Sequence, residues 1–511
     1  MLTLCTIDET WIRVDCTPDV ARELSDYFTF DAPGAKFMPA FRHRHWDGKI
    51  RLFKMKGHTI YKGLIPRIKE FAADRGYQCL DHVGGTRFGL RSVWPTVTDW
   101  LSTIDLPNGR TPRSYQIDAL DTCLGLQRGI IQSPTGSGKS LIIHLLHQMF
   151  DQYPVLIVVP TINLVTQMCE DFKSYGLDTD RSVHLISGGR EKVSPKSICI
   201  STWQSIFEQD DTYFNKFKMV IVDEVHLAKA KSLSGLMEKC TQVPLRFGFT
   251  GTLDDTLCHR LILEGLFGTI RKVATTDELV QSQHLAPLKV KLCVLEYPKA
   301  VCKSLRHATY PDEIEYLVTN PARDAFITQL VSHTKGNTLV LFQYVEKHGI
   351  QLVERIRQAT AGRKEVHYID GSIDAVERER IRQAVELGDN QILVASYGTT
   401  SLGVNITNLR TLVFASPSKS KYRVLQSIGR ALRMSEGKSH ATLVDIVDDL
   451  RIGKHVNFVF QHAQQRIEYY STEKFPYTLH QYPLSQAVAL KTGLEALGLT
   501  NPTPSDTQAT I

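Results

Sequence analysis

Residues 133–140 (Ser-Pro-Thr-Gly-Ser-Gly-Lys-Ser) have the types and spacing that hold the phosphates of a nucleotide. They follow the β-branched run 129–132 and precede the apolar run 141–146, so the sequence predicts a strand, a loop and a helix in that order. Gly136 and Gly138 allow the backbone N–H groups to turn toward phosphate oxygens. Lys139 is expected to reach the β- and γ-phosphates and Ser140 to bind Mg²⁺. Pro134, Thr135 and Ser137 complete the predicted loop.

Two adjacent acids form a second candidate group. Asp223 and Glu224 follow the apolar run 219–222, which predicts a strand with carboxylates at its C-terminal end. Ligands bind at that edge of open parallel sheets. Asp223 is expected to hold Mg²⁺ and Glu224 to orient the attacking water. A solvated turn is the alternative for an isolated pair, but its position after a phosphate loop favours catalysis.

A third group lies in residues 426–433. If this segment is helical, Gln426, Arg430 and Arg433 lie on one face. Arginines in such a position can meet the charge of a triphosphate and raise turnover by roughly a thousandfold or more. A surface helix with scattered arginines is the alternative.

Together these segments resemble the ordered motifs of superfamily 2 helicases of the DExH type, over roughly residues 100–450. The resemblance implies nucleotide binding (Arg113, Gln116, Gly403), strand contact (Thr161, Gly188, Thr202, Thr399) and coupling of ATP state to movement (His226, Thr250, Thr252, Gln426). Many relatives have Asp where Asn405 stands, so no charge-dependent role is implied there. Segments 39–52 and 63–64, together with 251–254, 395–398 and 444–449, are similar to the UvsW-type helicases of bacteriophages. That likeness implies recombination and repair of branched DNA and R-loops.

The N-terminal region carries a candidate DNA-binding hairpin. Asp47-Gly48 predicts a tight turn between strands at 41–46 and 49–53. Cations bind phosphates and aromatic rings stack on bases, which makes this hairpin a candidate for DNA contact. The candidate residues are Arg42, Arg44, Trp46, Lys49 and Arg51. A solvated strand face with Trp46 in the core is the alternative.

The expected fold class is α/β, with two tandem RecA-like parallel-sheet lobes, a small α+β N-terminal domain and a short helical C-terminal extension. The expected domains are 1–98, 99–285 (ATP-binding lobe), 286–455 (second lobe) and 456–511, the last ending in a disordered tail. Strands are expected at 11–15, 155–159, 197–201, 219–222 and 246–250, then at 338–342, 366–369, 391–395, 411–415 and 441–445. A helix is expected at 455–470, where packing on the second lobe is favoured over a role in separating DNA strands.

The composition agrees with a globular chain of several domains. The 511 residues are 42% hydrophobic and 22% charged, and the formal net charge of +6 suits a polyanionic partner. None of the ten cysteines forms a Cys-x-x-Cys pair, which argues against zinc-ribbon and iron–sulfur sites. No apolar run approaches the length of a membrane span or a secretion signal, so a soluble cytoplasmic protein is expected.

The sequence therefore predicts an ATP- and Mg²⁺-dependent DNA helicase or translocase. The expected partners are single-stranded and branched duplex DNA, an RNA–DNA hybrid and phage recombination proteins, with the enzyme acting as a monomer in the host cytoplasm. Three alternatives stay open: an RNA helicase, a double-strand translocase without unwinding, and a nucleotide-gated clamp that does not hydrolyse ATP. ATPase stimulation by DNA or by RNA tests the first alternative, and turnover of ATP in the presence of DNA tests the third.

Overall fold

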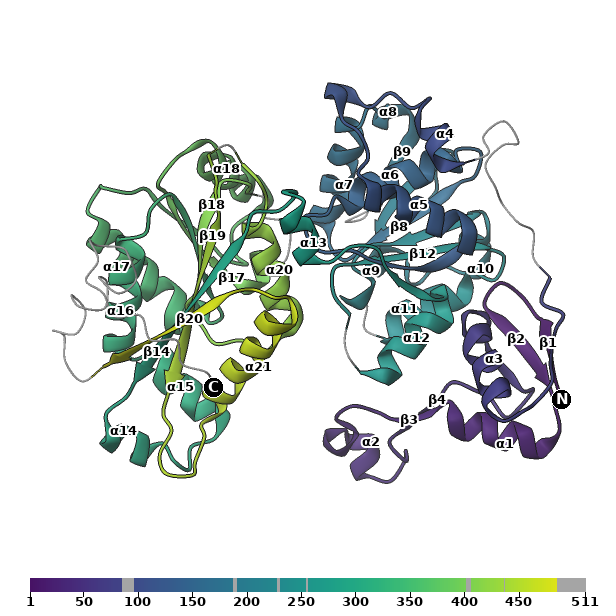
Figure 1. Ribbon diagram of the computed structural model, residues 1–511, viewed down its shortest axis with the longest axis horizontal. Coiled ribbons are helices and arrows are strands. Elements are labelled where there is room, and N and C mark those ends of the chain that lie inside the picture. The colour runs from purple at the N-terminus through teal and green to yellow at the C-terminus, as the bar shows by residue number, and fades with distance from the viewer. Residues whose placement is uncertain are drawn as a thin grey trace. The chain divides into compact units, whose positions relative to one another are not determined.

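The computed structural model describes residues 1–84, 96–186, 191–227, 230–253, 256–400, 406–435 and 437–484. Gly188, Gly403, Asp254 and Asn405 lie outside these residues, as does the predicted tail. The chain divides into two compact units, the first with residues 1–134 and 138–274 and the second with 135–137 and 275–511. Each unit holds one seven-stranded sheet (Figure 1).

The sheet of the first unit is parallel throughout, with the order β13-β7-β12-β11-β8-β10-β9. Its strands are β7 (Arg128–Gln132), β8 (Val155–Val159), β9 (Val183–Ile186), β10 (Ile198–Thr202), β11 (Met219–Val222), β12 (Leu245–Thr250) and β13 (Ile270–Lys272). Parallel strands that are buried on both faces have continuous runs of apolar, often β-branched residues. The strands predicted from such runs at 155–159, 197–201, 219–222 and 246–250 are confirmed. Every residue of β8 is fully buried.

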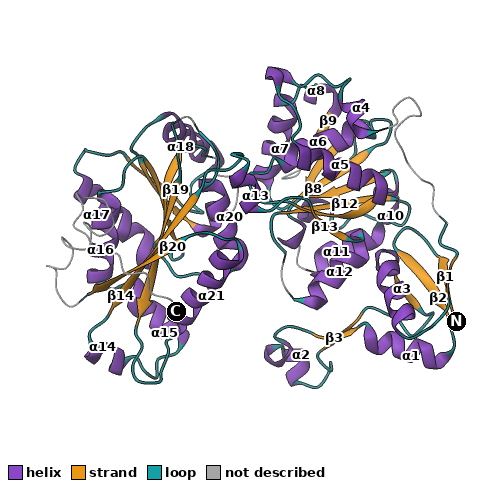
Figure 2. Cartoon of the chain, viewed as in Figure 1, coloured by secondary structure: helices purple, strands orange, loops and turns teal. Residues whose placement is uncertain are grey.

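Helices cover both faces of this sheet (Figure 2). They are α4 (Val97–Leu101), α5 (Ser114–Leu126), α6 (Lys139–Met149), α7 (Ile162–Ser174), α8 (Thr179–Ser182), α9 (Trp203–Ile206), α10 (Asp211–Asn215), α11 (Ala230–Lys239) and α12 (Leu257–Phe267). Crossover helices of this kind are what parallel strands require. The architecture is the predicted RecA-like lobe.

The second unit repeats the arrangement, with the order β16-β17-β15-β18-β19-β14-β20 and parallel pairing throughout. Its strands are β14 (Leu288–Glu296), β15 (Asn337–Phe342), β16 (Val366–Ile369), β17 (Ile392–Ser396), β18 (Leu409–Phe414), β19 (Ala441–Asp449) and β20 (Tyr477–Pro483). Its helices are α13 (Thr276–Gln281), α14 (Lys299–Ser304), α15 (Tyr310–Val318), α16 (Pro321–Ser332), α17 (Ile350–Thr360), α18 (Ala375–Leu387), α19 (Tyr397–Thr400), α20 (Lys421–Ala431) and α21 (Phe458–Thr472). The five predicted strands are confirmed; β14 and β20 were not predicted.

The C-terminal extension is built into the second lobe. The predicted helix is present as α21, and β20 then adds an edge strand beside β14. Arg466 of α21 donates to both carboxylate oxygens of Asp445 in β19, at 2.8 and 2.7 Å, and both side chains are buried. Tyr470 donates a further hydrogen bond to the same carboxylate at 2.8 Å. These contacts favour the packing role for α21.

Removal of Arg466 is expected to destabilise the second lobe. Arg466→Met leaves the Asp445 carboxylate buried without its cation, which typically costs about 3–5 kcal/mol. Urea unfolding should show this loss, and Arg466→Met/Asp445→Leu should recover most of it because no buried charge remains. A single variant as stable as the wild type would contradict this account of the pair.

The N-terminal domain has its own sheet, with the order β5-β2-β1-β6. Its elements are β1 (Leu2–Thr6), β2 (Trp11–Asp15), α1 (Pro18–Tyr27), β5 (Thr59–Tyr61), α3 (Ile65–Asp74) and β6 (Cys79–Asp81). The predicted strand at 11–15 is confirmed. One hydrophobic cluster runs from this domain into the first lobe, joining Leu64 and Phe71 to Leu261 and Leu266.

The domain also approaches the first lobe closely at one glycine. A side chain on Gly63 would place its Cβ only 2.2 Å from the carbonyl oxygen of Glu264 in α12. Arg67 bonds the Glu264 carboxylate at 2.9 Å. The domain is therefore fixed to the first lobe by packing and by an ion pair.

The predicted hairpin at 41–53 is wrong. Pro39–Arg42 forms the short helix α2, and β4 (Lys49–Arg51) pairs antiparallel with β3 (Thr29–Asp31). The Asp47-Gly48 turn is present, since Asp47 accepts the N–H of Lys49 at 3.1 Å and Gly48 has φ +78°. The turn joins a helix and a loop to a strand, and the pairing partner comes from earlier in the chain. Local turn chemistry could not reveal that partner.

Candidate nucleotide and nucleic-acid sites

The phosphate loop has the predicted strand–loop–helix setting. β7 ends at Gln132 and α6 begins at Lys139, with Gly136 and Gly138 at φ +86° and +79°. Such values favour glycine, because other residues are strained there. The N–H of Ser133 donates to the carbonyl of Thr250 at 2.9 Å, which ties the start of the loop to β12.

Arg113 and Gln116, which the resemblance assigns to nucleotide binding, lie beside this loop. Gln116 is buried in α5, and its side-chain oxygen accepts the N–H of Arg113 at 2.9 Å. A side chain on Gly138 would place its Cβ 2.6 Å from the Gln116 amide nitrogen. The loop is thus a cradle that a larger residue would fill, which fits close approach of a phosphate group.

Lys139 faces the carboxylate of Glu224, the candidate for water activation. Its ammonium lies 3.6 Å from Glu224 Oε1 and donates to the carbonyl of Ser133 at 3.4 Å. Both charged side chains are about one-tenth exposed, with side-chain exposures of 10% and 11%. Low solvent access strengthens their attraction relative to water. The structure therefore brings together the two groups that the sequence assigned to phosphate binding and water activation.

Asp223 and Glu224 end β11 in a strained turn. Glu224 has φ +48°, a left-handed conformation that costs a non-glycine residue on the order of 1–2 kcal/mol. Its N–H donates to Asp223 Oδ1 at 2.9 Å. Burial raises the pKa of Asp223 to about 7, and the neighbouring Glu224 charge adds to the rise. No sequence pattern indicated this backbone conformation.

The coupling candidates form a chain of hydrogen bonds. Thr250 Oγ1 donates to the carbonyl of Thr252 at 2.6 Å and lies 2.5 Å from His226 Nδ1. Because a hydroxyl has one hydrogen, His226 Nδ1 must be the donor to Thr250. His226 also lies 3.5 Å from Glu224, so the chain links this candidate carboxylate to the end of β12.

The donor atoms fit a magnesium nucleotide. Ser140 and Asp223 supply a hydroxyl and a carboxylate, the oxygen ligands that Mg²⁺ prefers. Ser140 is the second residue of α6, and its Oγ lies 2.8 Å from Tyr175 Oη. The N-terminus of α6 adds a positive dipole end toward the loop.

The second lobe confirms only part of the predicted arginine face. Gln426 and Arg430 lie in α20 and are each 7% exposed. Arg433 lies beyond the end of the helix, in an isolated bridge with Leu285, so its expected helical position is wrong. Beyond the end of α20, the Lys438 ammonium donates to the carbonyls of Ala431 and Arg433, at 2.6 and 2.7 Å.

Comparisons with known proteins agree with this arrangement. Three family models match: "DNA helicase UvsW, N-terminal" at residues 3–81, "Type III restriction enzyme, res subunit" at 110–255 and "Helicase conserved C-terminal domain" at 322–435. The ATP-dependent DNA helicase uvsW of Enterobacteria phage T4 is 33% identical over 496 residues, covering 92% of this chain and 97% of the relative. This chain belongs to the UvsW helicase family. It is an ATP-dependent helicase of superfamily 2.

More distant relatives share parts of the UvsW-family chain. The DNA 3'-5' translocase XPB2 of Sulfurisphaera tokodaii is 25% identical over 374 residues, covering 66% of this chain and 81% of the relative. A fragment of a putative HsdR subunit of a type I restriction enzyme from Vibrio vulnificus has a TM-score of 0.53 at 17% identity. That match covers 86% of this chain and 76% of the fragment, and it shows a common fold.

The residues predicted to contact a nucleic-acid strand differ in their exposure and in their hydrogen-bond partners. Thr161 directly precedes α7, and its Oγ1 is buried without a hydrogen-bond partner within the described part of the chain. Thr202 is 4% exposed and its hydroxyl pairs with Ser205 at 2.9 Å. Thr399 is 3% exposed and donates to the carbonyl of Ser396 at 2.9 Å. The hydroxyls of Thr202 and Thr399 are therefore already engaged within the lobes, in residues with little exposed surface.

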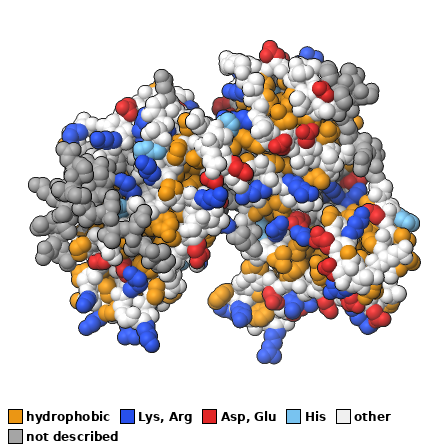
Figure 3. Space-filling view, viewed as in Figure 1, with side chains coloured by type: hydrophobic (Ala, Val, Ile, Leu, Met, Phe, Trp, Pro, Cys, Tyr) orange, Lys and Arg blue, Asp and Glu red, His pale blue; other side chains and the backbone are white. Residues whose placement is uncertain are grey.

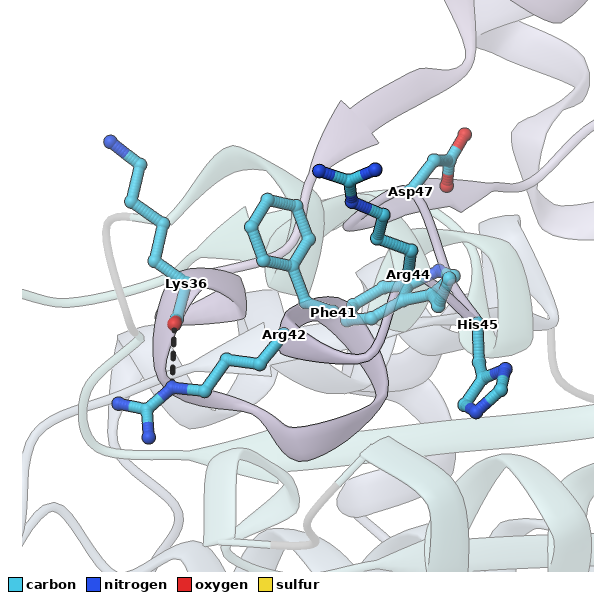
Figure 4. A pocket seen from close by; sticks show the side chains of 7 residues that line it. Lys36, Phe41, Arg42, Arg44, His45 and Asp47 are labelled. Carbon is cyan, nitrogen blue, oxygen red and sulfur yellow. Dashed lines mark hydrogen bonds between the residues drawn. The ribbon is translucent and has the colours of Figure 1, made fainter.

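Three of the N-terminal candidates, Arg42, Arg44 and Trp46, border an open hollow of about 610 Å³. Its lining residues are Lys36, Phe41, Arg42, Arg44, His45, Trp46 and Asp47. Figure 4 shows the Phe41 ring in the middle, with the charged ends of Lys36, Arg42 and Arg44 spread around it and directed outward. The hollow thus combines aromatic rings with three basic side chains and the Asp47 carboxylate.

Trp46 and Arg51 find their hydrogen-bond and ion-pair partners nearby in the chain. Trp46 Nε1 donates to the carbonyl of Lys49 at 2.9 Å, and Arg51 forms an ion pair with Asp47. Phe37 and Met38 expose 77% and 43% of their surface beside the hollow. Hydrophobic and basic side chains meet at the end of the first unit that carries α2 (Figure 3). We call residues 29–51 the basic module.

Within the described ranges, no helix has the length and hydrophobicity needed to cross a bilayer.

Proposed function

We propose that this UvsW-family helicase uses ATP and Mg²⁺ to remodel branched DNA in phage recombination, repair and replication. Its tasks are junction migration and the unwinding of R-loops and D-loops, in the cytoplasm of the host cell. The observation that carries the proposal is the basic module, because it belongs to a domain packed on the same lobe that holds Lys139 and Glu224.

The residues of the first lobe have distinct roles in hydrolysis. Lys139 and the loop N–H groups bind the phosphates, while Ser140 and Asp223 hold Mg²⁺, which neutralises the charge that develops on the phosphate oxygens. Glu224 orients water for attack on the terminal phosphate. His226, Thr250 and Thr252 connect this carboxylate to β12, so a change in phosphate contact can shift that strand end.

Arg430 and Arg433 of the second lobe are proposed to meet the phosphates when the lobes close. Gln426 and Gly403 assist, and reopening follows phosphate release. Thr161, Gly188, Thr202 and Thr399 are proposed to hold the DNA backbone, which carries no sequence information and suits an enzyme acting on any junction. Alternate closing and opening then moves the protein along the strand, and a monomer suffices for this cycle.

The basic module is proposed to contact the branch. Arg42, Arg44 and Lys49 are exposed and suited to phosphates. Exposed Phe37 is suited to stack on a base that is unpaired at a junction. Because the N-terminal domain is fixed to the first lobe, a branch held by the module keeps a constant relation to the ATP site.

ATP hydrolysis by the pure protein tests the proposal. The rate is measured without nucleic acid, and with single-stranded DNA, four-way-junction DNA and RNA of matched sequence. Stronger stimulation by the junction than by the single strand is expected. Stimulation by RNA alone would overturn the proposed substrate, while leaving the helicase assignment in place.

Loss of two module arginines is expected to weaken junction binding. Arg42→Gln/Arg44→Gln removes two phosphate contacts, so affinity should fall by about tenfold and the slope of log K against log salt by about 2. Fluorescence anisotropy with a labelled junction measures both. Arg22→Gln/Arg357→Gln removes the same charge from exposed helix positions and should bind normally. Equal loss in both variants would show that net charge, and not the module, sets the affinity.

A further inference from the structure

Tyr175 contacts the residue that is proposed to hold Mg²⁺. It lies directly after α7, outside every motif that the sequence indicated, and its Oη is 2.8 Å from Ser140 Oγ. Either hydroxyl can be the donor in this bond. The contact therefore joins the end of one crossover helix to the first turn of the helix that follows the phosphate loop.

The tyrosine ring is held on two sides. The Arg110 guanidinium lies 4.9 Å from its centroid, and the His144 ring lies 5.4 Å away. His144 also packs against Phe172 at 5.3 Å, and burial lowers its pKa to about 4, so it is a neutral ring at physiological pH. A side chain with so many ring contacts has little freedom to move its hydroxyl away from Ser140.

A serine that binds a metal uses its oxygen lone pairs, so its hydrogen needs another acceptor. Groups that bind a metal are usually oriented by a second hydrogen bond of this kind. Tyr175 Oη is within reach of that hydrogen, and accepting it leaves the lone pairs of Ser140 free for a metal. We infer that Tyr175 is a positioning residue that orients the Ser140 hydroxyl for Mg²⁺. This inference rests on the proposed role of Ser140.

The test is the binding of fluorescently labelled ADP to the full chain, with Mg²⁺ and with EDTA in its place. Tyr175→Phe keeps the ring and removes only the hydroxyl. Its affinity in Mg²⁺ should fall by about 10- to 100-fold, the usual effect of losing such a second hydrogen bond. Its affinity in EDTA should match the wild type. Tyr213→Phe is the matched control, because the buried Tyr213 hydroxyl has no hydrogen bond within the described residues.

A double variant separates this inference from the proposed function. Ser140→Ala should weaken Mg²⁺-dependent binding, and adding Tyr175→Phe should cause no further loss, because both changes act through one hydroxyl. If Ser140→Ala lowers the affinity while Tyr175→Phe does not, the role of Tyr175 is overturned and the metal site stands. If Tyr175→Phe loses the same affinity in Mg²⁺ and in EDTA, the positioning role of Tyr175 is also overturned, because a change in ring packing would then account for the loss. If Ser140→Ala changes nothing, the proposed metal role of Ser140 fails, and the inference fails with it.

Discussion

Replacement of Lys139 by alanine is expected to abolish ATP hydrolysis, lowering turnover by at least about a thousandfold. The ammonium is the cation of the phosphate loop, and it lies 3.6 Å from Glu224 in a site with little solvent access. Charge that develops on the phosphates at that position is stabilised far more than it would be in water. No other lysine lies in the loop to replace it.

Binding of DNA should survive the same change, because its proposed contacts lie elsewhere on the lobes and in the basic module. Steady-state phosphate release and anisotropy with a labelled junction measure the two properties separately. Lys272→Ala removes an exposed lysine from β13 of the same sheet and should leave both unchanged. Normal turnover in Lys139→Ala would refute the assignment of the ATP site.

The two lobes and the strand–loop–helix geometry of the candidate ATP site could be predicted from the sequence because their signals are local. A parallel strand buried on both faces must be apolar along its whole length, as in Val155–Val159, so the chain records it directly. The phosphate loop likewise needs glycines and a lysine at fixed spacing. Asp223 and Glu224 could be placed at the same edge because the carboxyl ends of parallel strands meet there.

Features that depend on distant contacts were missed. The Asp47-Gly48 turn was recognised, but β4 pairs with β3 because of the fold of the N-terminal domain. Arg433 fits the helical spacing, yet α20 ends at Ala431 where Lys438 takes the carbonyl groups. Tyr175 carries no motif, and only the packing of α7 against α6 brings it to Ser140. For β4 and for Tyr175 a partner from another element decides the local structure, whereas the contact of Lys438 comes from only seven residues beyond Ala431.

The left-handed backbone at Glu224 also depends on its surroundings, and it holds the candidate catalytic carboxylate. Strain of this kind persists where the surrounding structure holds a residue in one position. The N–H of Glu224 is bonded to Asp223, and its carboxylate is near both Lys139 and His226. The turn therefore fixes the direction of the carboxylate just after β11, as its proposed role in orienting an attacking water requires.

Glu224→Gln is accordingly expected to lower hydrolysis by about 10²- to 10⁴-fold while nucleotide binding is retained. Glutamine has the same size and can keep the strained turn, so the change isolates the loss of the basic carboxylate. Single-turnover hydrolysis and labelled-nucleotide titration measure the two steps, with Glu208→Gln at an exposed position of the same lobe as the control. A variant that binds nucleotide poorly but hydrolyses it at the normal rate would assign Glu224 to binding. The distinction matters because Lys139 and Glu224 are in contact. If one variant loses nucleotide binding and the other loses only the chemical step, the cation holds the phosphates and the carboxylate orients the water.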